Sequence, residues 1–190
     1  MRLVCGVGIN DLKDIPTKDC PYYRVWQSML TRCYSKSFLQ KNPSYKGCSV
    51  STEWLIFSTF KKWMVQQDWV GKQLDKDLLQ FGNHIYSPET CIFVSQELNT
   101  LLTDRRNHRG AYPLGVYFMK SKNLFKASCG VAGVQMYLGA YNTVEKASKA
   151  YISFKKELIR IAALQQVDAR LKQALLTIAE NYEEIYATNR

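Results

Sequence analysis

The sequence has few of the residues that mark zinc sites and membrane spans. Its six cysteines, at positions 5, 20, 33, 48, 91 and 129, form no Cys-x-x-Cys pair, and there are only two histidines. Zinc sites usually need such close pairs, so we expect buried free thiols, with a metal site or a disulfide as the less favoured alternatives. No apolar run approaches the roughly 20 residues that cross a bilayer, and the first residues contain no long apolar core of the kind found in signal peptides. The expectation is a soluble, cytoplasmic protein.

Basic residues, in contrast, are abundant. The chain of 190 residues carries a formal net charge of +10, and 46% of it is hydrophobic, which is enough for a buried core. The positive charge is densest between residues 112 and 160, where 8 basic residues face 2 acidic ones. Lys and Arg side chains release condensed counterions when they bind phosphates, so a polyanion is the expected partner. Ordinary solubility charge is the alternative.

The chain divides into four predicted regions of an α+β protein: 1–102, 103–111, 112–163 and 164–190. In the first, apolar residues at helical spacing predict helices over 22–34 and 51–64. Ser51 or Thr52 is expected to cap the second helix. These two helices should pack against strands and turns in 74–99.

Residues 103–111 are predicted to be a basic linker. Arg105, Arg106 and Arg109 lie within five positions, beside Asn and Gly residues. Phosphate contact is the favoured interpretation, and a solvated charge run is the alternative.

Alternating apolar residues predict three strands, 114–120, 124–130 and 134–141. A helix should follow, with Thr143 as its N-cap, and this helix should cover one face of the sheet because three short strands need such a cover. The last region, from about 164, repeats a helical pattern as one C-terminal helix, for packing or for a homodimer contact.

Two parts of the sequence resemble known families. Gly115-Val116, Phe125-Lys126-Ala127 and the stretch YLGAYNTVEKASKAY resemble the APETALA/ethylene-response-factor type of DNA-binding domain. Tyr23, Trp26, Arg32-Cys33-Tyr34, Glu53-Trp54-Leu55 and Leu74-Asp75-Lys76-Asp77 resemble the HNH-type endonucleases of phages. The combination is similar to a homing-type endonuclease with a C-terminal targeting module. It implies a degenerate ββα-metal unit, then a three-stranded sheet with a helix, acting on double-stranded DNA in the cytoplasm of a host cell.

The strand period predicts which sheet residues point outward. Alternation places Val116, Phe118, Ala127, Met136 and others on the core face. The expected DNA-binding residues on the opposite face and hairpin tip are Tyr117, Met119, Lys120, Lys122, Lys126, Ser128, Gln135 and Tyr137. An antiparallel sheet fits the major groove, where such side chains reach base edges. Members of this family contact bases largely through arginines on this face. This sequence has Tyr117, Met119 and Gln135 there, so the DNA target of the family cannot be assigned to it.

The HNH resemblance implies a catalytic histidine, a central asparagine and ligands for a divalent ion. Asp75 and Asn99 match the metal positions, but Lys76 occupies the place of the catalytic base and Thr90 that of the central asparagine. A lysine has a reference pKa of about 10.4 and is a charged donor rather than a base near neutrality. Lys76 is therefore expected to bind phosphate, and His84 is the other candidate base if the Gly82-Asn83 turn folds back over Lys76.

The leading functional hypothesis is a phage or mobile-element DNA-binding protein that acts by occupying a site, as a repressor or interference factor, with no cofactor and no membrane. The first alternative is an active Mg²⁺-dependent HNH endonuclease or nickase. The second is a protein that inhibits a host enzyme by binding it.

Overall fold

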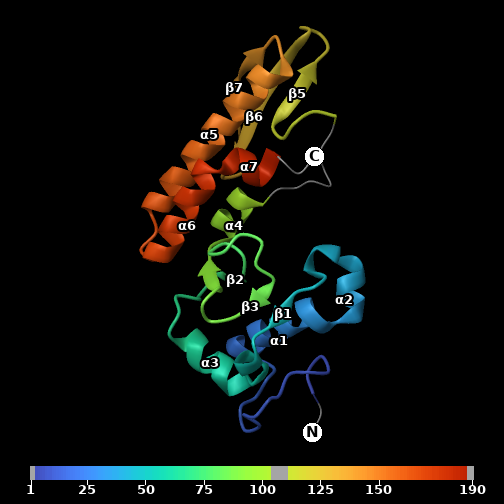
Figure 1. Ribbon diagram of the computed structural model, residues 1–190, viewed down its shortest axis with the longest axis vertical. Coiled ribbons are helices and arrows are strands. Elements are labelled where there is room, and N and C mark those ends of the chain that lie inside the picture. Colours follow the sequence, from blue (N-terminus) through green and yellow to red (C-terminus); the bar gives the residue numbers. More distant parts are fainter. Residues whose placement is uncertain (1–2, 104–110, 188–190) are drawn as a thin grey trace. The chain divides into compact units, whose positions relative to one another are not determined.

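The computed structural model describes residues 3–103 and 111–187. The chain forms two compact units, Met1–Ser95 and Gln96–Arg190, and both mix helices with strands (Figure 1). The α+β class predicted from the sequence is confirmed. Among the described residues, no helix is both long and apolar enough to cross a membrane.

The first unit contains short elements around one aromatic core. They are α1 (Pro21–Tyr34), α2 (Lys36–Lys41), the 3-10 turn η1 (Pro43–Tyr45), β1 (Ser49–Val50), the 3-10 turn η2 (Thr52–Leu55), α3 (Phe57–Val65), β2 (Gln73–Asp75), β3 (Ile85–Tyr86) and β4 (Ile92–Val94). The polar stretch 35–47 contains the short helix α2, and the Ser35 side chain caps this helix by accepting the Phe38 N–H.

The core of this unit follows from the spacing of apolar residues in α1. Pro21 stands in the first turn, where its missing N–H costs nothing. Trp26, Met29 and Leu30 then fall on one face and are almost fully buried. The Trp26 indole donates to the Trp54 carbonyl over 2.7 Å, so a buried polar group has a partner.

The single helix predicted over 51–64 is wrong. Ile56 has an extended backbone (φ −98°, ψ 124°), which separates η2 from α3. The reason is a long-range pairing with Ile9, whose N–H donates to the Leu55 carbonyl and whose carbonyl accepts the Phe57 N–H. Ser51 also makes no side-chain cap.

Two small strand pairs close the first unit. β1 runs parallel to β3, and β2 runs antiparallel to β4 with Leu74 opposite Phe93. β4 is buried along its whole length. The β2–β4 pair joins the ends of the loop between Asp75 and Ile92, and the β1–β3 pair holds its middle at Ile85 and Tyr86.

The second unit contains α4 (Gln96–Leu102), β5 (Val116–Met119), β6 (Leu124–Val131), β7 (Val134–Tyr141), α5 (Val144–Leu164), α6 (Ala169–Glu180) and α7 (Tyr182–Ala187). The three strands form an antiparallel sheet in the order β5-β6-β7. Thr143 is the N-cap of α5, and its side chain accepts the Lys146 N–H as predicted. Val116 and Ala127 of the sheet pack against Ala147 of α5, so the predicted sheet covered by a helix is confirmed.

The region after residue 164 is two helices rather than one. α6 runs beside the C-terminal half of α5 (Figure 1). Leu171, Leu175 and Ile178 are buried there, which accounts for them as packing residues within one chain. The apolar pattern from about 164 includes Leu164 and Val167, but Leu164 ends α5, Val167 lies in the turn before α6, and the two are 69% and 100% exposed.

Candidate functional site

The stretch that resembles a nuclease core forms a tight loop after β2. The Asp75 carboxylate accepts the N–H groups of Asp77 (3.0 Å) and Leu78 (2.8 Å). This is a local side-chain to backbone turn, which aspartate favours because its short side chain reaches two and three residues ahead. One oxygen of Asp75 is therefore already used by the protein.

Lys76 does not occupy the surface position expected of a phosphate-binding residue. It is only 8% exposed, and its ammonium donates to the Asp77 carboxylate (2.8 Å) and to the Asn83 carbonyl (3.0 Å). Burial alone would lower the pKa of Lys76, but the hydrogen bond to Asp77 and the charges of Asp77, Cys48 and Asp75 raise it above its ordinary value. Lys76 is thus protonated and hydrogen-bonded within its own loop, and its contact with phosphate stays a prediction.

Asn83 adds further hydrogen bonds to this loop, and the sequence reasoning assigned it no role. Its amide donates to the carbonyls of Lys76 (2.7 Å) and Ile85 (2.6 Å), and its side-chain oxygen accepts the Ile85 N–H (3.2 Å). The Gly82-Asn83 pair is the sequence feature that indicates this role. Gly82 has a positive φ of 78°, as in a tight turn, and Asn favours such side-chain to backbone hydrogen bonds.

The turn does fold back over Lys76, but it does so through Asn83. The side chain of His84 lies against Cys48 instead, with 3.8 Å between Nδ1 and the Cys48 sulfur, and it is solvent-exposed. Thr90, in the position expected for the central asparagine, donates to the Ile85 carbonyl over 2.8 Å and so braces the same loop. His84 as a catalytic base stays a prediction.

The residues around Asp75 do not fit a catalytic magnesium ion. Burial raises the pKa of Asp75 to about 6, and the charge of Asp77 adds to this, against the lowering effect of the two backbone N–H groups. The Lys76 ammonium pairs with the Asp77 carboxylate beside it. Within 3–103 and 111–187 no group of three His, Cys, Asp or Glu side chains is placed to hold a metal. Asp75 and Asn99 as a metal pair stay a prediction.

The sheet of the second unit presents the other candidate site. Tyr117 lies opposite Lys126 on β5 and β6, and Ser128 lies opposite Tyr137 on β6 and β7. Directly paired residues share a face, so these four side chains point away from the face that packs on α5. The pairing passes from Ala127–Gly139 to Ser128–Tyr137, which leaves Leu138 as an extra residue in β7.

We call Tyr117, Lys126, Gln135 and Tyr137 the outer sheet face. Tyr117 and Tyr137 are 54% and 61% exposed, and Gln135 is exposed. The Lys126 ammonium lies 5.8 Å from the centre of the Tyr137 ring. Lys120 and Lys122 are exposed at the turn between β5 and β6, while Met119 is partly buried.

Two sheet residues differ from the prediction. Ser128 points to the expected side but is 2% exposed, and its hydroxyl is the partner of the Gln135 amide at 3.5 Å, so it does not reach a base edge as placed. Met136, predicted as core, is 43% exposed although it lies opposite the buried Cys129. The exposed residues from Ala132 to Val134 show that this end of the β6–β7 hairpin receives little cover.

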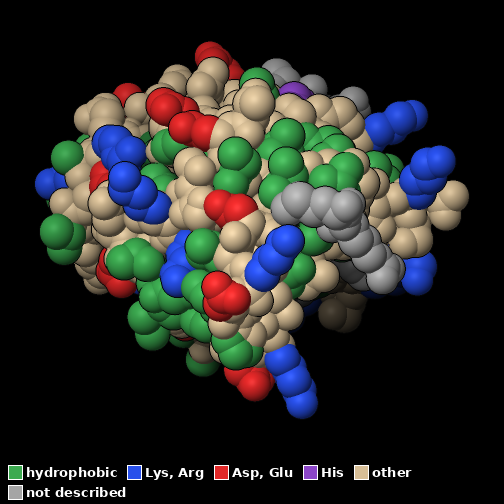
Figure 2. Space-filling model, turned by 90° about the horizontal axis from the view of Figure 1, so that it is seen from below, with side chains coloured by type: hydrophobic (Ala, Val, Ile, Leu, Met, Phe, Trp, Pro, Cys, Tyr) green, Lys and Arg blue, Asp and Glu red, His purple; other side chains and the backbone are tan. Residues whose placement is uncertain are grey.

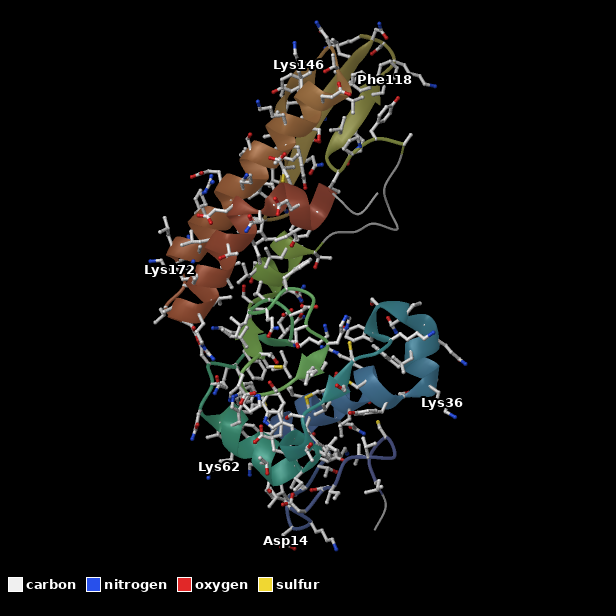
Figure 3. The ribbon with its side chains drawn as sticks, in the orientation of Figure 1. Asp14, Lys36, Lys62, Phe118, Lys146 and Lys172 are labelled. Carbon is white, nitrogen blue, oxygen red and sulfur yellow. The ribbon has the colours of Figure 1, made fainter. Side chains whose placement is uncertain are left out.

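The three linker arginines, Arg105, Arg106 and Arg109, lie outside the described residues, so their phosphate contacts stay predictions. On the face drawn in Figure 2, the coloured Lys and Arg side chains are interspersed with Asp and Glu. Lys146 near the start of α5 and Phe118 on β5 both lie at the sheet end of the second unit (Figure 3). Of the eight basic residues between 112 and 160, five lie in α5, and Lys120, Lys122 and Lys126 lie on β6 or the turn between β5 and β6.

No family model matches the chain, and the comparisons with curated proteins and with solved structures found no match.

Proposed function

We propose that the protein binds double-stranded DNA through the outer sheet face and acts by occupying its site, not by cutting. The observation that carries this proposal is the combination of exposed Tyr117, Gln135 and Tyr137 on one sheet face with Lys120 and Lys122 at its hairpin tip. Lysines position a protein on the phosphate backbone, and a glutamine amide can pair with an adenine edge. The resemblance to a DNA-binding sheet domain and to HNH proteins gives the same partner.

The Lys76 loop supports the absence of cutting. Proton abstraction by a well-placed general base contributes about 10²- to 10⁴-fold, and Lys76 is held protonated by Asp77. The loop instead provides a rigid edge of the first unit, because its polar groups bond to each other. In this proposal the first unit is a retained scaffold.

The test is a binding titration at several salt concentrations with duplex DNA. Lys120→Ala combined with Lys122→Ala should weaken binding and reduce the slope of log K against log salt by about one unit for each phosphate that the variant no longer binds. The matched control is Lys36→Ala combined with Lys172→Ala, which removes the same charge from exposed positions on α2 and α6 (Figure 3). An equal reduction in both double variants would mean that general charge, not the sheet, binds the DNA.

Incubation of the unchanged protein with phage DNA and Mg²⁺ should give retention without strand breaks. Efficient Mg²⁺-dependent cleavage that is abolished by Asp75→Ala would overturn the proposal. Loss of that cleavage in His84→Ala as well would identify the base.

A further inference from the structure

The outer sheet face carries two aromatic rings that do not pack into the core. Among the described residues, the only aromatic side chains that are largely exposed are Phe81, Tyr117 and Tyr137, and two of these three lie on this face. Tyr117 is on β5 and Tyr137 is on β7, while α5 packs against the opposite face of the same three strands. Large rings with one polar end are typical of binding surfaces, so this face fits a partner with flat apolar groups.

A cation lies between the two rings. Lys126 is on the central strand β6, is the direct pairing partner of Tyr117, and places its ammonium 5.8 Å from the centre of the Tyr137 ring. The segment 112–141, which contains the whole sheet, has three lysines and no Asp or Glu. Aromatic and cationic side chains without carboxylates on the same strands fit a polynucleotide, whose bases present flat faces and whose phosphates are negative.

The spacing of the two tyrosines differs from that of stacked bases. Tyr117 lies opposite Lys126, and Tyr137 lies opposite Ser128, two residues further along β6. Neighbouring strands are about 4.8 Å apart and each residue advances about 3.3 Å, so the Cα atoms of the two tyrosines lie about 12 Å apart. Neighbouring bases on one strand of a regular duplex are only about 3.4 Å apart and cover each other's faces. Both rings can therefore stack only on bases that have left the helical stack.

We propose that Tyr117 and Tyr137 stack on unpaired bases, so that the preferred target of this face is DNA with locally unpaired nucleotides, such as a bulge, rather than a regular duplex. This inference rests on the proposed function, because it concerns the same face and narrows the class of DNA that the face recognises. Each ring stacks on one base, and Lys126 neutralises a phosphate between them. Stacking tolerates any base, because each base has such a face, so the shape of the DNA rather than its sequence determines this preference.

The experiment measures how tightly the full chain binds two DNAs, by fluorescence anisotropy at one salt concentration. One is a short intact duplex, and the other is the same duplex with two extra unpaired nucleotides at its centre. The bulged duplex should bind about fivefold or more tightly than the intact one, because stacking of a single base on an aromatic ring contributes about that factor or more. Equal affinity for the two DNAs would overturn this inference and leave the proposed function in place, whereas no binding of either DNA would overturn both.

Three variants separate stacking from the flexibility of the bulge itself. Tyr117→Leu combined with Tyr137→Leu keeps apolar side chains but removes both rings, and it should bring the ratio of the two affinities close to one. Tyr117→Phe combined with Tyr137→Phe keeps the rings without their hydroxyl groups and should keep the ratio. The matched control Phe81→Leu removes the exposed ring of the first unit and should leave the ratio unchanged.

The variants give two results that would overturn the inference. One is a preference for the bulged duplex that survives in the double leucine variant. The other is a preference that is lost in the double phenylalanine variant or in Phe81→Leu. Both tyrosines are more than half exposed, so the circular dichroism spectrum should be the same for all variants.

Discussion

Gly115 is the position at which the smallest substitution should disturb the second unit most. Its φ is 75°, and an added Cβ would overlap the Tyr151 ring and lie 2.8 Å from the Ser128 carbonyl oxygen. Tyr151 is a buried residue of α5. Gly133, in the turn between β6 and β7, has a similar φ of 81°, but a methyl group added there would meet nothing within 4 Å.

These two glycines form a matched pair. A left-handed backbone costs a residue with a Cβ about 1–2 kcal/mol, and this applies to both. Overpacking of a filled core adds about 1–3 kcal/mol, and this applies to Gly115 alone. Gly133→Ala should therefore lower the free energy of unfolding of the second unit by about 1–2 kcal/mol, and Gly115→Ala by about 2–5 kcal/mol.

The distribution of tryptophan allows the two units to be followed separately. All four tryptophans, Trp26, Trp54, Trp63 and Trp69, lie in the first unit. In urea unfolding, tryptophan fluorescence reports on that unit, while far-ultraviolet circular dichroism also reports on the long helix α5. Gly115→Ala should shift the dichroism transition and leave the fluorescence midpoint in place.

Two results would refute this reasoning. Equal destabilisation by Gly115→Ala and Gly133→Ala would show that the Tyr151 ring moves aside at no cost. A fluorescence midpoint that shifts together with the dichroism transition would show that the two units unfold as one.

Three further predictions concern single side chains. Asp75 has a folded pKa of about 6, above the roughly 3.9 of an unfolded aspartate, so its stabilising contribution is present below about pH 4 and is lost as pH rises through 6. Asp75→Asn should remove up to about 3 kcal/mol of this pH dependence, measured by fluorescence-detected unfolding at pH 4 and pH 8; an unchanged pH profile would contradict the assignment. Lys76→Met should destabilise the first unit by about 1–3 kcal/mol because it removes the bonds to Asp77 and Asn83. It should leave the salt dependence of DNA binding unchanged, and a smaller slope would identify Lys76 as a phosphate contact. Thr143→Ala should cost the second unit about 1 kcal/mol, seen by dichroism and not by fluorescence, because it removes the cap of α5.

The sequence was most informative where structure depends on neighbours in the chain. The strands of the sheet and the cap at Thr143 were predictable because alternation, turn residues and capping are local signals. The break at Ile56 was not, since its cause is the distant Ile9.

In the candidate site, too, the sequence predicted local features but not the contacts between distant residues. The alternation rule gave the direction of Tyr117, Lys126 and Tyr137, but it could not show that Ser128 is covered. In the same way, the sequence Leu74-Asp75-Lys76-Asp77 predicts an exposed charged turn. Only the structure shows that Asn83 folds back and forms hydrogen bonds with Lys76.

The strand pairs of the first unit affect how the chain folds during synthesis. Ser49 pairs with Ile85, and Leu74 pairs with Phe93 of the buried β4. An emerging chain that ends before residue 93 therefore lacks the β4 residue that packs into the aromatic core beside Trp63, and this part of the core stays open to water and to other chains. The second unit, in contrast, joins elements that follow one another directly, from β5 to α5. On the ribosome, correct folding of the first unit thus depends on uninterrupted elongation. We expect aggregation to be most favoured when synthesis pauses before β4.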